Sequence, residues 1–226
     1  MFAEFFCKKR MGCLACTVAI AVFSICIGYA HSFLMIKSIE INEEFYFLIS
    51  DDTHIEASAE LVKWDGGAGY LLEEGGTRYV AITVFMDRAS AEIVQQRLLT
   101  NGQRTSLLKR GTQKLYFKGK EKEKRELYVS ALNLFKNYLV LLEDCITKLE
   151  NGMTQEACKR ILKTIERQFR CAQNLYAGYV AFKEVCGNTI NDIVEICTHT
   201  VYLKDLRYLL CWQAEKYIQL CDSFAL

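Results

Sequence analysis

The stretch that decides the fold is a short motif that occurs twice in the middle of the chain. Residues 57–62 read ASAELV and residues 89–94 read ASAEIV, an offset of 32 residues. An internal repeat at a fixed offset indicates that one structural unit is present twice. The residues that flank the two copies are also related, and they extend the unit in both directions.

Each copy lies between two short runs that are typical of strands. An apolar run precedes each motif, at residues 45–49 and 79–85, and LLEEG (71–75) or LLKRG (107–111) follows it. Residues 78–85 alternate between two faces, which is the period of a half-buried strand. Acidic residues precede both motifs and glycines follow them, as helix ends require. Each copy therefore predicts a strand, a helix and a strand.

Two such units predict an α+β fold. Their order is that of a ferredoxin-like β-α-β-β-α-β module, a four-stranded sheet with both helices on one face. We expect the other face to be open to a partner. By strict alternation, the strand residues on that open face are Tyr79, Ala81, Thr83 and Phe85, and those under the helices are Val80, Ile82 and Val84.

Residues 44–118 resemble the sporulation-related repeat (SPOR) domain family of bacterial envelope proteins. The matching residues are the strand at 79–82, Phe85 at its end, Ala91 in the following helix, Leu98, and Gly102 after that helix. Thr83 stands where the family usually carries glycine. The resemblance implies that the chain binds peptidoglycan glycan strands in cell division or sporulation.

A neutral glycan needs a shallow groove with aromatic faces and hydroxyl or amide groups. We predict that Tyr70, Tyr79, Thr83 and Phe85 form this groove on the open sheet face. The alternative is that these aromatic residues pack beneath the C-terminal helices and contact no ligand.

The N-terminal region predicts a membrane anchor. Residues 11–36 contain no Asp, Glu, Lys or Arg, and about 20 such residues cross a bilayer. Residues 8–10 are basic and the chain after residue 37 is acidic, which places the N-terminus in the cytoplasm and the bulk of the chain outside. Residues 1–37 then form the cytoplasmic tip and anchor. A cleaved signal peptide remains the alternative.

The C-terminal half predicts a long antiparallel three-helix bundle over residues 119–226, behind an α+β domain at residues 38–118. Breaks are expected at residues 151–152 and 187–188, where glycine and asparagine meet. The first helix carries an apolar stripe with heptad spacing at Leu127, Ala131, Leu134, Tyr138, Leu141 and Cys145.

No catalytic or metal-binding motif is visible. The chain has only three histidines, and its 11 cysteines have neither zinc-ligand spacing nor a compact disulfide framework, so we predict no metal and no cofactor. Cys145 and Cys158 lie equally far from the turn at residues 151–152, and we expect them to form a disulfide if the compartment is oxidising. A thiol-dependent enzyme is the remaining catalytic alternative.

Composition excludes three further classes. Lys and Arg number 28 against 27 Asp and Glu, so nucleic acid is not an expected partner. At 51% hydrophobic and 24% charged residues, the chain is neither disordered nor a multi-spanning membrane protein. We therefore predict a non-enzymatic, membrane-anchored envelope protein that binds glycan strands. The alternative is an interaction scaffold that binds an envelope protein through its helical bundle.

Overall fold

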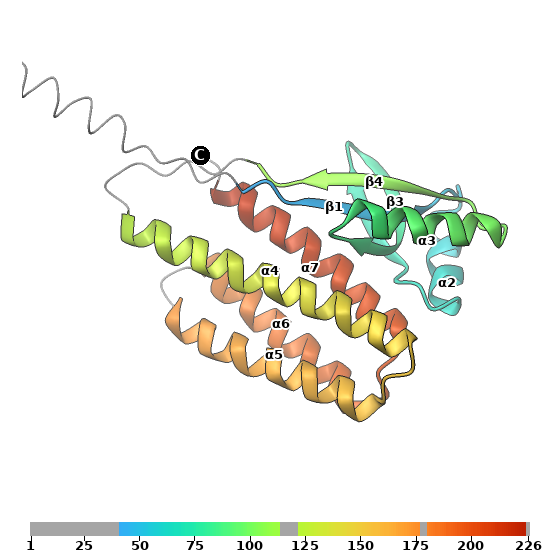
Figure 1. The fold of residues 1–226 in the computed structure, drawn as a ribbon. Helices are drawn as coiled ribbons and strands as arrows, with labels where there is room; N and C mark the ends of the chain where they lie inside the picture. The colour runs from blue at the N-terminus through green and yellow to red at the C-terminus, as the bar shows by residue number, and fades with distance from the viewer. Residues whose placement is uncertain (1–40, 114–121, 177–179, 225–226) are drawn as a thin grey trace, which may run out of the picture.

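The computed structural model describes residues 41–113, 122–176 and 180–224, which form four strands and six helices (Figure 1). The first part contains β1 (Glu44–Ser50), α2 (Ile55–Trp64), β2 (Tyr70–Glu74), β3 (Thr77–Phe85), α3 (Arg88–Thr100) and β4 (Thr105–Gly111). The second part contains α4 (Lys122–Glu150), α5 (Gln155–Leu175), α6 (Val180–Thr198) and α7 (Leu203–Phe224). Within these ranges, no helix is long and apolar enough to span a bilayer. The predicted anchor at residues 11–36 lies outside them.

The four strands form one antiparallel sheet in the order β2-β3-β1-β4. The elements follow one another as predicted, strand-helix-strand twice, so the α+β class is confirmed. Ala59 and Ala91, the third residues of the two repeat motifs, are both buried. Asp87 caps α3, because its carboxylate accepts the Ser90 N–H at 2.8 Å.

The predicted alternation along β3 is wrong, because the pairing of β1 with β3 contains an irregularity. Leu48 pairs with Thr83, but the next residue, Ile49, pairs with Ala81. The extra residue in β3 is Ile82, and it reverses the faces on either side, as a β-bulge does. Tyr79 and Ala81 therefore share the face of Val84, whereas Thr83 and Phe85 lie on the face beneath the short helices.

The sheet face that we expected to be open is covered by the C-terminal helix. In Figure 1, α7 runs along one side of the sheet and α3 lies on the other. Residues of α7 contact β2 and β3, and the rings of Phe45 in β1 and Tyr217 in α7 meet edge to face at 5.7 Å. The physical reason is that Phe45, Phe47 and other large apolar side chains of this face must leave water.

The predicted three-helix bundle contains four helices in the structure. The expected break at residues 187–188 is wrong, because α6 runs through it. Gly187 lies against α5, where a Cβ atom would sit 3.3 Å from Gln173 Nε2, so this glycine permits close helix packing. The chain instead turns after α6, where the Gln155 side chain donates to the Val201 carbonyl and accepts its N–H, at 2.9 and 2.8 Å. These two bonds satisfy the backbone of a buried turn residue.

One hydrophobic core runs from the sheet into the bundle. It includes sheet residues such as Phe47 and Leu72 together with the buried aromatic residues of the helices. Phe135, Tyr138 and Phe169 contact one another with ring centroids 4.9 to 6.0 Å apart, and Phe135 also contacts Tyr217. The sheet and the four long helices therefore share one hydrophobic core.

Candidate functional site

The four residues predicted to bind glycan do not form one surface. Tyr70 is only 8% exposed, and its ring meets Tyr208 of α7 at 5.2 Å. Tyr79 is half-buried against the main core on the same sheet face. Thr83 is buried and Phe85 is half-buried on the opposite face. This arrangement matches the alternative in which the tyrosines pack beneath helices, while glycan binding by the chain stays a prediction.

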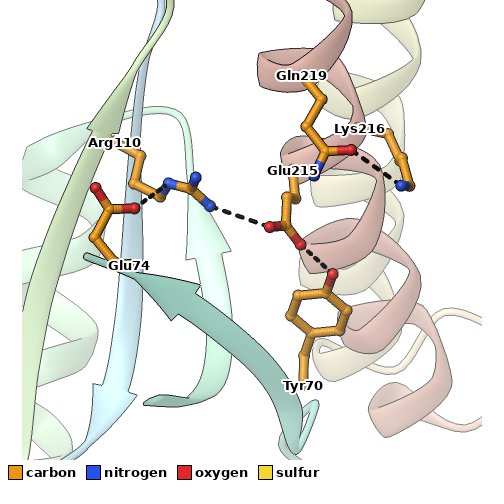
Figure 2. A network of polar contacts seen from close by, with 6 residues as sticks. All are labelled: Tyr70, Glu74, Arg110, Glu215, Lys216 and Gln219. Carbon is orange, nitrogen blue, oxygen red and sulfur yellow. Dashed lines mark hydrogen bonds and ion pairs between the residues drawn. The ribbon is translucent and has the colours of Figure 1, made fainter. Parts of the chain in front are cut away.

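Tyr70 belongs to a polar network that joins the sheet to α7, shown in Figure 2. Its hydroxyl donates to the Glu215 carboxylate. Arg110 of β4 bridges two carboxylates, with Nε 2.9 Å from Glu74 and Nη1 3.3 Å from Glu215. Burial, followed by the hydrogen bond to Glu215, raises the pKa of Tyr70 well above its ordinary value. The phenol therefore stays protonated and acts as a donor that holds α7 in register on the sheet.

The predicted alignment of Cys145 and Cys158 is confirmed. The two side chains are fully buried on α4 and α5, with their Sγ atoms 3.1 Å apart, and both cysteines are free thiols in the structure. Their shared hydrogen bond, followed by burial, raises the pKa of Cys145, and the same hydrogen bond lowers the pKa of Cys158. The covalent bond itself stays a prediction.

The helical bundle carries a shallow groove between α4 and α5, of about 480 Å³. Its apolar lining comes from Leu134, Ala172, Leu175 and Tyr176, and Leu175 is 74% exposed. The Tyr176 hydroxyl donates to Ser130 Oγ at 3.0 Å across the groove. We name this surface the α4–α5 groove.

The heptad stripe on α4 is only partly a core stripe. Ala131, Tyr138 and Cys145 are buried as expected, whereas Leu127 and Leu141 are 42% and 38% exposed. Leu134, midway between those two leucines, lines the α4–α5 groove. The core is instead completed by the neighbouring positions Leu132, Phe135, Leu139, Leu142 and Ile146. The three heptad leucines therefore form an incompletely buried apolar edge along α4. The heptad pattern had predicted that they lie in the core.

A second hollow, of about 620 Å³, lies between α2 and α3 over the sheet. Sequence reasoning did not predict this hollow, although Val62 and Val94, the last residues of the two repeat motifs, both line it. No three His, Cys, Asp or Glu residues of the described ranges come together as metal ligands.

Comparison of the chain with protein-family models, with curated proteins and with solved structures found no match. The resemblance to SPOR domains therefore stays a prediction from the residues quoted above.

Proposed function

We propose that the protein is a non-enzymatic, membrane-anchored interaction scaffold, which binds an amphipathic helix of a partner protein in the α4–α5 groove. The observation that supports this proposal is a row of incompletely buried leucines at heptad spacing on α4. Leu134 lines the groove, and Leu127 and Leu141 lie seven residues before and after it. Leucines repeating every seven residues on one helix are the pattern to which a second helix packs.

The composition of the groove favours a helix over a small polar ligand. Its walls are mostly apolar, and Leu175, at 74% exposed, is the most exposed large hydrophobic side chain among them. Arg167 and Gln168 are exposed residues that also line the groove and provide polar groups beside the apolar ones, as protein interfaces commonly do. Burying an exposed leucine is worth about 1.5–3 kcal/mol, so a few such contacts supply useful affinity.

Site-specific photo-crosslinking of the full chain in its own cells tests this function. A photoreactive amino acid in place of Leu175 is expected to form a discrete adduct with one other protein. The same probe in place of Trp64, which is 86% exposed on α2, serves as the position control and is expected to form none.

A matched pair of double variants sharpens the test. Leu127→Gln with Leu141→Gln changes leucines that are 42% and 38% exposed on the same heptad stripe of α4 as Leu134, and it should abolish the adduct. Leu71→Gln with Leu99→Gln changes leucines that are 40% and 41% exposed elsewhere, and it should leave the adduct unchanged. Equal adducts in both variants would contradict the proposal. So would an adduct of the chain with a second copy of itself.

A further inference from the structure

The hollow between α2 and α3 is a cleft over the sheet that shares no lining residue with the α4–α5 groove, and Arg207 of α7 reaches its edge. In Figure 1 the two helices point in different directions, and α2 stands near the end of the sheet from which β4 starts. Ile82, Thr83 and Thr105 form part of the base of the cleft. Leu61 and Val62 from α2 line one wall.

The base of this cleft contains a buried hydroxyl that has no partner. Thr105 is 5% exposed, and its Oγ1 forms no hydrogen bond within the part of the chain that the structure describes. The neighbouring hydroxyls of Ser50 and Ser58 bond to each other at 3.2 Å, and neither bonds to Thr105 Oγ1. Buried polar atoms are nearly always paired, because an unpaired one costs free energy. The Oγ1 atom is shielded from the cleft in the structure, so a ligand pairs with it only after the Thr105 side chain rotates toward the cleft.

The charged groups around the cleft are also unequally satisfied. Each carboxylate on its lining accepts a hydrogen bond: Asp51 from Ser106 Oγ at 2.5 Å, Asp52 from the His54 N–H at 3.4 Å, and Asp65 from Gln103 Nε2 at 3.5 Å. Arg97, Arg104 and Arg207 line the same cleft. Arg207 bonds to the Gly66 carbonyl and to Glu150, whereas the guanidinium groups of Arg97 and Arg104 have no ion-pair or hydrogen-bond partner among the described residues. Each of the three carboxylates thus accepts at least one hydrogen bond, whereas the side chains of Arg97 and Arg104 have no partner.

The cleft is apolar between its charged rim and its hydroxyl base. Leu61, which is 60% exposed, and Val62 face Val94 and Leu98 of α3 across it. A ligand that fits must therefore combine an anionic head with a hydrocarbon body. A carboxylate suits the head best, since guanidinium binds carboxylate through two parallel hydrogen bonds.

We propose that the α2–α3 cleft binds an apolar molecule that ends in a carboxylate. The carboxylate pairs with Arg97 or Arg104, and it accepts a hydrogen bond from the Thr105 hydroxyl once that side chain has rotated toward it. The hydrocarbon part lies between the walls formed by α2 and α3. Two sources offer this chemistry, a free carboxylic acid and the C-terminus of a peptide with an apolar last residue.

The test measures binding to the full chain in lipid nanodiscs by isothermal titration calorimetry. Hexanoate stands for the free acid and N-acetyl-leucine for the peptide terminus, and hexanamide and N-acetyl-leucinamide are their uncharged controls. At least one carboxylate should bind, about tenfold or more tighter than its amide, because a hydrogen bond to a charged group is worth this much. The probe that binds more tightly identifies the source.

Three variants assign the binding to the cleft. Thr105→Val keeps the shape of the side chain, and it should weaken carboxylate binding while raising the Tm of the free protein, because the unpartnered hydroxyl is gone. Arg97→Gln with Arg104→Gln should weaken binding about tenfold or more. Arg160→Gln, which changes an exposed arginine on α5, should leave binding unchanged.

Several results would overturn the inference. They are the absence of binding by both carboxylates, equal binding of acids and amides, and normal binding by Thr105→Val. Because the cleft and the α4–α5 groove share no residue, failure here leaves the proposed scaffold function standing, and failure of the crosslinking test leaves this inference standing.

Discussion

At Gly69 the backbone leaves no room for a side chain. Its φ is +57°, and a Cβ atom would lie 2.4 Å from the Ala59 carbonyl oxygen. Gly75 has nearly the same φ, +58°, with nothing within 4 Å of a Cβ atom. We expect Gly69→Ala to lower the free energy of unfolding by about 1–3 kcal/mol more than Gly75→Ala, measured by urea denaturation of the full chain. Equal losses would show that the left-handed backbone, and not the contact, dominates.

Two carboxyl groups should make stability depend on pH. Burial raises the pKa of Glu143 to about 6, and burial followed by Glu195 raises that of Asp192 to about 6. In the unfolded chain these groups titrate near about 4, so the folded state holds their protons longer. The free energy of unfolding should therefore fall as the pH rises from about 4 to about 6.

Urea titrations at several pH values check this dependence. Glu143→Gln and Asp192→Asn should each flatten the profile in that window, because the group that titrates is gone. An unchanged slope in both variants would contradict the assignment to these two carboxyl groups.

At the scale of elements, local signals were enough to predict the order of strands and helices but not their faces. The repeat predicted β-α-β-β-α-β because motif, caps and alternation are local features. The bulge at Ile82 escaped because it depends on how β1 pairs with β3. The break after α6 escaped because it depends on Gln155, 46 residues away from Val201 in the chain.

The residue contacts that form the two candidate sites could not be predicted from the sequence either. A heptad stripe fixes which side chains share a helix face, and α4 obeys it. It does not fix which of two adjoining faces becomes the core, and on α4 that choice favoured Phe135 and Leu139 over Leu127 and Leu141. The α2–α3 cleft depends on the angle between two helices, which no residue pattern here specifies.

The α4–α5 hairpin carries the prediction that belongs to this scale. The 3.1 Å separation of the Cys145 and Cys158 Sγ atoms is about 1 Å more than a disulfide bond. Oxidised glutathione should therefore accept two electrons and two protons from this pair and yield two reduced glutathione molecules. The loop closed is short, so the disulfide should stabilise the protein by roughly 2–3 kcal/mol.

Mass spectrometry after alkylation under denaturing conditions detects the bond as two unmodified cysteines. Cys186→Ser, which removes another buried thiol, should leave the result unchanged, whereas Cys158→Ser should abolish it. Full alkylation of both cysteines after oxidation would contradict the prediction.

At the scale of the molecule, the sheet and the helical bundle bury each other's apolar surfaces. The sheet offers Phe45, Phe47, Tyr70 and Leu72 to α7, and Arg110 and Glu215 fix the contact (Figure 2). Which amphipathic surface covers which is decided by contacts between residues far apart in the sequence. This is why the sequence supported an open sheet face equally well.

The shared core predicts that residues 38–118 do not fold alone. We expect this fragment to bind a hydrophobic dye and to unfold without cooperativity, because an apolar sheet face exposed to water outweighs what its short helices bury. Circular dichroism with chemical denaturation checks this. A sharp, cooperative transition would instead establish residues 38–118 as an independent domain, as the sequence predicted.

The contact between Phe45 and Tyr217 forms only after a long interval of synthesis. About 170 residues separate these two side chains, and at about 5–20 residues per second their synthesis is separated by roughly 10–30 s. During that interval the apolar face of the sheet is exposed, because α7, the helix that packs on it, has not yet been synthesised. We therefore expect a chaperone that binds exposed apolar segments to associate with the nascent chain until α7 leaves the exit tunnel.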